Sequence, residues 1–218
     1  VASDETLVAS PTIKFGTLTW AGDGALTFVE MQKDGVGGVD GLNGSYSVTV
    51  SPDGNHVYAA SYDGDAVVVF SRNASTGALT FVETEKDGVG GVDGLDGARS
   101  VTVSPDGNHV YVAGTIDDAV AVFSRNASTG ALRFEEMEKD GVGGVDGLDS
   151  TRSVTLSPDG NHLYAASHGD DAVAAFSRES SISSEHLEVA ASTSVTPSSV
   201  SGLTNTWETS KLKADIGN

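Results

Sequence analysis

The chain repeats itself with a fixed period of 53 residues. Gly35, Gly88 and Gly141 are separated by this interval, and each belongs to a copy of one glycine-rich loop. A period of this size is typical of propellers and solenoids, in which one supersecondary unit is stacked several times. Because the three copies are nearly identical, we expect little room in them for a single asymmetric active site.

Each period encodes four short strands. Residues 47–50 alternate in polarity and lead through a Ser-Pro-Asp-Gly turn at 51–54 into a return strand at 55–60. Proline at the second turn position fixes φ, and glycine supplies a positive φ before the chain returns. A second pair, 66–70 and 79–83, flanks another turn, and its valine-rich member is apolar on both faces, as expected of a strand covered on both sides. Four strands per repeat make a propeller blade.

The sequence therefore predicts an all-β propeller over residues 1–191. We expect full blades at about 47–83, 100–136 and 153–190, and an N-terminal half-blade at 12–32. This count leaves the half-blade without its first two strands.

The Ser/Thr-rich tail, residues 192–218, is the candidate for those two missing strands. Its composition alone is typical of a disordered or glycosylated stalk. However, Val195 and Leu203 lie in two strand-like segments, and the two tryptophans, Trp20 and Trp207, lie in the half-blade and the tail. Because an unpaired strand edge is normally covered, we expect the tail to complete a half-blade, either in its own chain or in a neighbouring one.

The repeat also resembles that of a known family. The sequence Ser-Val-Thr-Val-Ser-Pro-Asp-Gly-Asn-His-Val-Tyr at 100–111, then Asp-Asp-Ala-Val-Ala-Val-Phe at 117–123 and Thr-Gly-Ala-Leu at 129–132, is similar to the blade of lactonase-type β-propellers. These are the 6-phosphogluconolactonase-like and YVTN group. The resemblance covers roughly residues 25–178 and implies a lactonase-type hydrolase. Members usually form a seven-bladed ring, for which this chain is too short.

Composition excludes several kinds of partner and site. Lys and Arg number 12 against 31 Asp and Glu, a formal net charge of −19, so nucleic acid and anionic membrane surfaces are not expected partners. The absence of cysteine excludes disulfides and thiolate metal sites. The sequence has no apolar run long enough to span a bilayer. Because the chain starts at Val1 rather than Met, we expect a processed protein that is secreted or displayed on a cell surface.

The glycine-rich loops are candidate calcium sites, because carboxylates and inward-turned carbonyls are the ligands that calcium requires. The alternative is a long connection between blades in which aspartates cap turns. No other cofactor is expected. The candidate ligands are Asp87, Asp93, Asp96, Asp140, Asp146 and Asp149, with Asp34 and Asp40 in the first copy.

Three further groups of residues are candidates for sites. His56, His109 and His162 could bind zinc, but we interpret them as partly exposed strand residues beside a turn, far from one another; His168 and His186 have no evident partner. Asn73 and Asn126, like Asn43, fit the N-glycosylation pattern, although asparagine is also favoured as a turn residue. Arg99 and Arg152, with Tyr46 in the first copy, could line a channel mouth and bind an anion, but we expect the arginines to pair with loop aspartates.

These observations favour a non-enzymatic extracellular scaffold that assembles with itself into a ring or filament by strand complementation. The alternatives are the lactonase-type hydrolase of the family resemblance and a surface module that binds calcium or glycan. The sequence shows no Ser-His-Asp set, no Gly-x-Ser-x-Gly elbow and no phosphate-binding loop.

Overall fold

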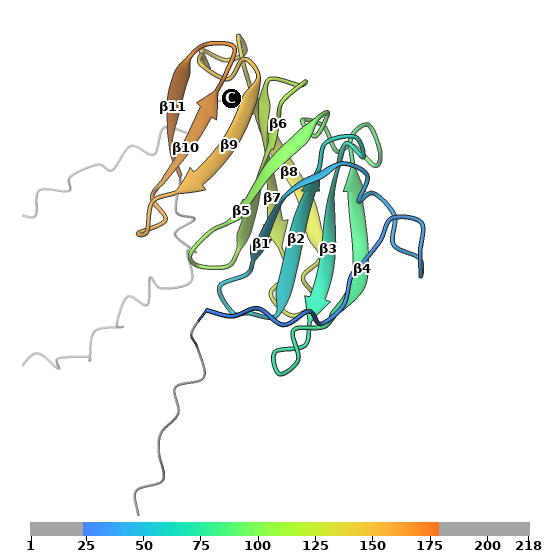
Figure 1. The fold of residues 1–218 in the computed structure, drawn as a ribbon. Coiled ribbons are helices and arrows are strands. Elements are labelled where there is room, and N and C mark those ends of the chain that lie inside the picture. Colours follow the sequence, from blue (N-terminus) through green and yellow to red (C-terminus); the bar gives the residue numbers. More distant parts are fainter. Residues whose placement is uncertain (1–23, 179–218) are drawn as a thin grey trace, which may run out of the picture. The chain divides into compact units, whose positions relative to one another are not determined.

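A computed structural model describes residues 24–178, which form eleven β-strands and, within that range, no helix (Figure 1). The all-β prediction is therefore confirmed. No helix in this part of the chain is long and apolar enough to cross a lipid bilayer. The strands are β1 (Ser45–Val50), β2 (His56–Ser61), β3 (Ala66–Arg72), β4 (Leu79–Lys86), β5 (Ala98–Val103), β6 (His109–Gly114), β7 (Ala119–Arg125), β8 (Leu132–Lys139), β9 (Thr151–Leu156), β10 (His162–Ser167) and β11 (Ala172–Ser177).

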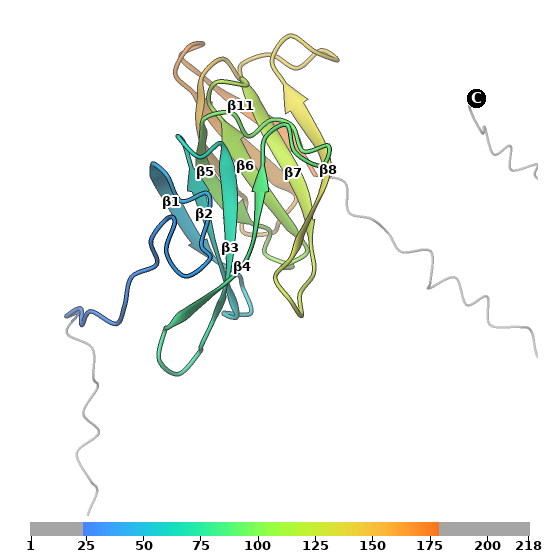
Figure 2. The ribbon, with the colours of Figure 1, turned by 90° about the vertical axis from the view of Figure 1, so that its right-hand side faces the viewer.

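The strands form three antiparallel sheets in chain order. The first two are four-stranded, β1-β2-β3-β4 and β5-β6-β7-β8, and the third contains β9, β10 and β11. They correspond to the predicted blades, and are called blade 1, blade 2 and blade 3 below; the predicted fourth strand of blade 3 falls outside the described residues. The first strand of each blade lies beside the first strand of the next, β1 by β5 and β5 by β9, as Figures 1 and 2 show. These first strands are therefore the inner strands of a propeller.

The turns form as their sequences predict. In the Ser-Pro-Asp-Gly turn of blade 1, Gly54 has φ of 74° and its backbone N–H donates to the Ser51 carbonyl at 2.8 Å. The carboxylate of Asp53 accepts from the Ser51 hydroxyl at 2.6 Å and from the Asn55 N–H at 3.0 Å. The turn thus connects β1 to β2 and fixes the direction of the Asp53 side chain.

The N-terminal half-blade differs from its prediction. The half-blade predicted at residues 12–32 should contain strands, but residues 24–32, the part of it that the structure describes, form none. A strand needs a neighbouring backbone, whereas here two side chains contact Leu79: Glu30 Oε1 accepts from the Leu79 N–H at 2.6 Å, and Gln32 Nε2 donates to the Leu79 carbonyl at 3.1 Å. The rest of the half-blade, Trp20 included, and the tail residues Val195, Leu203 and Trp207 lie outside the described residues.

Apolar side chains fill the seam between blades 1 and 2. Tyr58, Val67 and Val69 of blade 1 pack against apolar side chains of blade 2 that include Val110 and Phe123. All five side chains are fully buried. The double-faced burial predicted for the valine-rich strand is confirmed, because Val67, Val68 and Val69 are all buried. Burial of side chains of this size contributes about 1.5–3 kcal/mol each.

A buried arginine crosses the same seam. Arg125, at the end of β7 in blade 2, reaches into blade 1 with a side chain that is 1% exposed. Its Nη2 lies 2.7 Å from Asp53 Oδ2 and 2.8 Å from His56 Nδ1, and its Nε donates to the Tyr58 hydroxyl at 2.7 Å. Its Nη1 donates to the Gly107 carbonyl of its own blade at 2.8 Å. We call this set, Asp53, His56, Tyr58 and Arg125, the first lock.

The second lock repeats the first between blades 2 and 3. Arg178 Nη2 pairs with Asp106 and lies 3.1 Å from His109 Nδ1, while its Nη1 donates to the Gly160 carbonyl at 3.1 Å. Despite partial burial, hydrogen bonds from Ser104 and Arg178 lower the pKa of Asp106 to about 2. The Asp53 pKa is lowered in the same way, by Ser51, Asn55 and Arg125. Both carboxylates are therefore ionised in the folded protein at neutral pH.

Replacing Arg125 with alanine should lower the free energy of unfolding by about 3 kcal/mol, because it leaves the buried Tyr58 and His56, and the Asp53 carboxylate, without their shared partner. Urea denaturation followed by circular dichroism measures this loss. The matched control is Arg133→Ala, since Arg133 forms only an exposed pair with Glu135 in its own strand and should change stability by less than about 0.5 kcal/mol. Equal effects of the two substitutions would contradict a structural role for the lock.

Candidate functional site

The glycine-rich loops cross from the last strand of one blade to the inner strand of the next. The loops after β4 and β8 run over the same end of the sheets, at the top of Figure 2. In the loop of blade 2 the Leu95 N–H donates to Asp87 Oδ1 at 3.0 Å, which closes the loop and holds the buried Leu95 side chain in the core. A Cβ on Gly114 would lie 2.3 Å from the Gly94 carbonyl oxygen, so this crossing has no room for a side chain.

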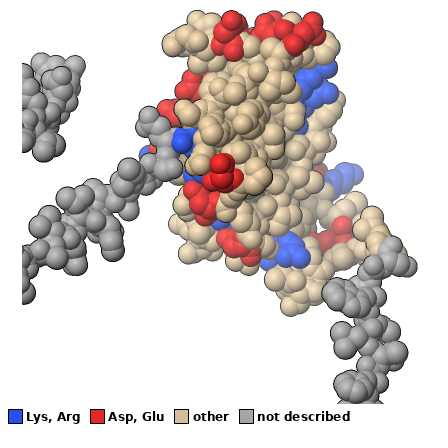
Figure 3. Space-filling model, turned by 90° about the vertical axis from the view of Figure 1, so that its left-hand side faces the viewer, with Lys and Arg blue, Asp and Glu red and all other residues tan. Residues whose placement is uncertain are grey.

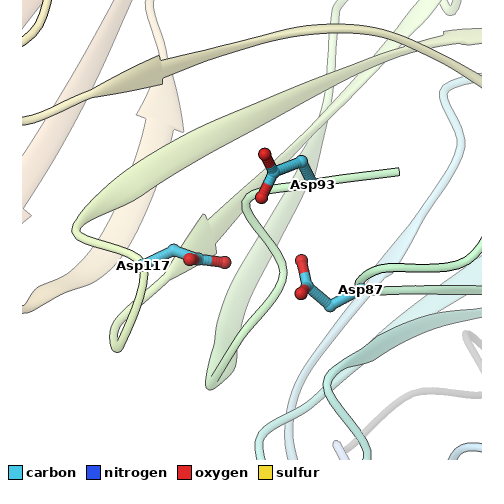
Figure 4. Close-up of side chains that lie close together, drawn as sticks. All are labelled: Asp87, Asp93 and Asp117. Atoms are coloured by element: carbon cyan, nitrogen blue, oxygen red, sulfur yellow. The ribbon is translucent and has the colours of Figure 1, made fainter. Parts of the chain in front are cut away.

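Three carboxylates converge beside this loop. One oxygen from each of Asp87, Asp93 and Asp117 lies within 4.8 Å of the others (Figure 4). The sequence predicts the first two as candidate ligands together with Asp96, but Asp96 is not one of the three. Its backbone N–H instead donates to Asp117 Oδ2 at 2.8 Å.

The next repeat forms the same cluster from Asp140, Asp146 and Asp170. Here the predicted Asp149 lies outside the cluster, and its N–H donates to Asp170 Oδ2 at 2.9 Å. Sequence reasoning missed Asp117 and Asp170 because they come from the turn after the second strand rather than from the glycine-rich loop. The available signal was the Asp-Asp pair at 117–118 and 170–171, which replaces Gly64-Asp65 of the first repeat.

The first repeat offers only two carboxylates at these positions, Asp34 and Asp40, because Gly64 stands where the third would be. Asp34 keeps its structural role and accepts from the Leu42 N–H at 2.8 Å. Asp40 pairs with Lys86 Nζ at 3.2 Å.

Negative charge accumulates at the blade 2 loop. Burial raises the pKa of Asp87, and Asp117, Asp93 and Asp65 raise it further. Burial also raises the pKa of Asp96, with Asp65 and Asp117 adding to the effect. A divalent cation would relieve this repulsion, but calcium takes six to eight oxygen ligands. The observed hydrogen bonds of Asp87 and Asp117 to loop N–H groups already explain these residues as loop supports, so calcium binding stays a prediction.

The three repeated histidines have separate surroundings. His56 is 4% exposed, not partly exposed as predicted, because Arg125 covers it; His109 is half-buried beside Arg178, and His162 is exposed. Burial lowers the pKa of His56 and of His109, and the neighbouring arginine lowers each further. No histidine belongs to a metal-type cluster among residues 24–178. The structure thus assigns His56 and His109 to the locks.

Arg99 and Arg152 lie at the loop end of the inner strands. The prediction that they pair with loop aspartates is wrong, because neither forms an ion pair within residues 24–178. The Arg99 guanidinium instead lies over the ring of Tyr46, 4.9 Å from its centroid, and that ring contacts Tyr62 at 5.6 Å. Arg152 is exposed. Within residues 24–178, Arg99 and Arg152 are thus positive charges without a carboxylate partner at this end of the inner strands.

His168 lies at the same end of blade 3 as Arg152. The residues that precede the two, Ser167 and Thr151, are paired across β10 and β9, and their hydroxyls are 2.8 Å apart. His168 is exposed, and its backbone N–H donates to the Ser150 carbonyl at 3.2 Å. The sequence indicates no partner for His168, because its position opposite Ser150 depends on strand register.

Asn73 and Asn126 are exposed in the turns that follow β3 and β7. The Asn73 side-chain oxygen accepts from the N–H groups of Ser75 and Thr76, and Asn126 makes the same bonds in its own turn. This geometry accounts for asparagine as turn chemistry, and glycosylation remains a prediction.

A cavity of about 440 Å³ lies between blades 2 and 3 and is lined by residues that include His109, Tyr111 and Phe176. At the same place between blades 1 and 2, Leu132 and Phe134 of β8 fill the seam. The equivalent strand of blade 3 lies outside the described residues. We therefore interpret this cavity as part of a blade seam rather than as a ligand site.

Comparison with known proteins gives one consistent result. The family model described as "Lactonase, 7-bladed beta-propeller" matches residues 14–148 and 92–200. The chain is 31% identical over 115 residues to a 6-phosphogluconolactonase of Formosa agariphila, covering 52% of this chain and 30% of that protein. It is 25% identical over 143 residues to a 6-phosphogluconolactonase of Klebsiella pneumoniae, covering 64% and 41%. The chain therefore spans well under half the length of these relatives.

Solved structures agree on the fold. The periplasmic gluconolactonase of Pseudomonas aeruginosa superposes with a TM-score of 0.53 at 26% identity, over 63% of this chain and 36% of that one. A structure from Bacteroides uniformis gives a TM-score of 0.55 at 24% identity, over 65% and 38%.

Replacing Asp87 with asparagine should raise the free energy of unfolding at pH 7 by about 0.5–1 kcal/mol, because it removes a charge repelled by its neighbours while keeping the acceptor for Leu95. The raised pKa means that ionised Asp87 costs stability at neutral pH, and that this cost disappears as the pH falls through the folded-state pKa. The gain over wild type should therefore shrink toward pH 4 in denaturation curves.

Asp34→Asn is the matched control for this substitution. Asp34 holds the same loop position, but Gly64 removes one of its carboxylate neighbours, so the control should change stability less at pH 7. A loss of stability in Asp87→Asn at neutral pH would show that the cluster is held by a bound cation rather than strained by repulsion.

Proposed function

We propose that this chain, which belongs to the lactonase family of seven-bladed β-propellers, forms three blades of a propeller that hydrolyses a sugar-acid lactone. The observation that carries the proposal is the family match over most of the chain, together with the 31% identity to a protein named 6-phosphogluconolactonase. These comparisons support lactone hydrolysis better than the non-enzymatic scaffold predicted from the sequence. Secretion, self-assembly through the tail and glycan binding remain predictions.

The inner mouth of the blades is the proposed substrate site. The product of lactone hydrolysis is a carboxylate, and a 6-phosphorylated substrate carries a phosphate as well. A chain with a formal net charge of −19 repels such anions unless it presents cations locally. Arg99 and Arg152 present guanidinium groups at this mouth, and guanidinium binds carboxylate and phosphate through paired hydrogen bonds.

The two arginines would have different tasks. Arg99 lies over Tyr46 and is half-buried, so its guanidinium is held in one place and suits the binding of the distal anionic group. Arg152 is exposed and unpaired with any carboxylate among the described residues, so it is free to approach the reacting carbonyl.

Hydrolysis needs a base and a stabiliser for the developing oxyanion. Water adds to the lactone carbonyl carbon, the ring C–O bond breaks, and a carboxylate and a hydroxyl group result. In this proposal His168 accepts the proton from the attacking water, since a neutral imidazole carries a basic ring nitrogen, and Arg152 donates to the carbonyl oxygen as it becomes negative. His168 follows the last residue of β10 and Arg152 is the second residue of β9, so both lie at the same end of blade 3, which supports the assignment.

The proposal predicts turnover of 6-phosphoglucono-δ-lactone above the spontaneous rate, measured by acid release in a pH-stat. Replacing His168 with alanine should lower kcat by about 100-fold, the usual contribution of a general base. Arg152→Ala should lower kcat/KM by a similar factor. Arg133→Ala, a surface arginine on β8, is the control and should retain full activity. A wild-type protein no faster than buffer would reject the proposal for this chain.

A further inference from the structure

The contacts of the first lock fix the protonation state of His56. An arginine side chain carries only N–H donors and stays charged at every pH at which proteins fold. Arg125 Nη2 lies 2.8 Å from His56 Nδ1, so Nδ1 is the acceptor and carries no proton. The ring is therefore neutral, with its one proton on Nε2. Because His56 is 4% exposed, this contact is shielded from solvent.

The other edge of the ring rests on the turn between β7 and β8 of blade 2. A Cβ on Gly130 would lie 2.2 Å from His56 Cδ2 and 2.9 Å from its Nε2, so the turn has room for the ring only because this residue is glycine. The ring also hydrogen-bonds to the backbone of Thr129 in the same turn. The Gly130 carbonyl accepts from the Tyr58 hydroxyl at 2.9 Å. Blade 2 thus encloses His56, and a change at this ring acts directly on the contact between the blades.

Within the first lock, His56 is the side chain that can change its charge in mild acid. Burial raises the pKa of Tyr58, and hydrogen bonds keep the pKa of Asp53 low despite its partial burial. Burial lowers the pKa of His56, and the charge of Arg125 lowers it further, while the charge of Asp53 acts in the opposite direction. The other three members therefore keep their charge where histidine normally titrates.

The charged groups on the strands packed beside His56 are already engaged. Arg72 ends β3, the strand paired with β2, and its Nη1 donates to the Gly54 carbonyl at 2.9 Å. Glu83 of β4 accepts from the Leu132 N–H of blade 2 at 2.6 Å. The charges that act on the ring are those of Arg125 and Asp53, which are paired with each other.

We propose that His56 makes the seam between blades 1 and 2 sensitive to acid. A proton on Nδ1 turns the acceptor of Arg125 into a donor, so that two N–H groups face each other and the bond is lost. It also places two positive charges in contact, with Asp53 as the one carboxylate between them. The first lock is then weaker, and blades 1 and 2 separate more readily.

The second lock repeats this arrangement in the next seam. Arg178 Nη2 lies 3.1 Å from His109 Nδ1. Burial lowers the pKa of His109 and Arg178 lowers it further, whereas two carboxylates, Asp106 and Glu135, act in the opposite direction. Because His109 is half-buried and is influenced by a second carboxylate, we expect a smaller response to acid there.

The free energy of unfolding should fall as the pH drops below about 6.5, the ordinary pKa of histidine. In this range the unfolded chain takes up a proton that the first lock excludes, and the loss stops growing below the folded-state pKa of His56. The acidic loops respond in the opposite direction, because burial raises the pKa of Asp87 and Asp96. Figure 3 shows acidic groups gathered at the top, the end of the sheets that carries these loops. A wild-type pH profile therefore mixes both effects, and a comparison of variants is needed.

Nuclear magnetic resonance of the histidine rings in the wild-type chain tests the protonation state. We expect His56 to carry its proton on Nε2 at pH 7 and to titrate at lower pH than His162, which holds the same position in blade 3 and is exposed. A proton on Nδ1 at pH 7, or titration of His56 together with or above His162, would overturn the proposal.

The variant His56→Asn tests the consequence, because asparagine keeps an acceptor near the position of Nδ1 and does not titrate. Between pH 7 and pH 5 the unfolding equilibrium constant of wild type should rise relative to that of the variant, by at most about tenfold per pH unit, the limit for one proton. The control is His162→Asn, which should leave the wild-type pH profile unchanged.

Hydrogen exchange at the Leu132 amide reports on the same seam, since this N–H bonds across it to Glu83. Its protection factor should fall several-fold from pH 7 to pH 5 in wild type and less in His56→Asn. Equal falls in the two proteins, or parallel unfolding profiles, would contradict the proposal. If His56→Asn does not fold, the ring titration and the Leu132 exchange of wild type decide the outcome. These measurements need no substrate, so they are independent of lactone hydrolysis.

Discussion

Two β-sheets that meet face to face share no backbone hydrogen bonds across most of their contact, so side chains alone must fix how they sit together. Here an arginine guanidinium does so at each seam, buried in the first lock and half-buried in the second. Arg125 is 1% exposed and is hydrogen-bonded to a carboxylate, a histidine and a tyrosine of the preceding blade. An apolar seam tolerates small sliding displacements, whereas a planar donor with several partners does not. The locks thus fix the position of each blade relative to its neighbour.

The locks and the glycine-rich loops support opposite ends of each seam. At one end arginine joins the blades; at the other, aspartate carboxylates accept loop N–H groups, as Asp65 Oδ1 does from Gly97 at 2.9 Å. Both ends are needed to place the inner strands, and with them Arg99 and Arg152, at a common mouth. In the proposed function the acidic loops contribute by position, because they support the inner strands that carry Arg99 and Arg152.

Sequence repeats allowed the blades, the turns and the buried valine strand to be predicted, since these depend on local pattern. Side-chain contacts between blades could not be predicted from the sequence. The pairing of Asp53 with Arg125 spans 72 residues and depends on how one sheet rotates against the next. The grouping of Asp117 with Asp87 and Asp93 could not be predicted either, because Asp117 comes from a turn that only the folded arrangement brings beside the glycine-rich loop. The half-blade predicted at 12–32 has no strand in its described part, residues 24–32, because an alternating sequence forms a strand only where a neighbouring backbone pairs with it.

The central claim is that the lock couples neighbouring blades energetically, and a double-mutant cycle between Asp53 and Arg125 tests it most directly. The cycle compares the unfolding free energies of wild type, Asp53→Asn, Arg125→Met and the double variant. The account predicts a coupling of about 2 kcal/mol, within the range of contacting residues that share one network. A coupling below about 0.3 kcal/mol, the value expected of independent sites, would contradict it.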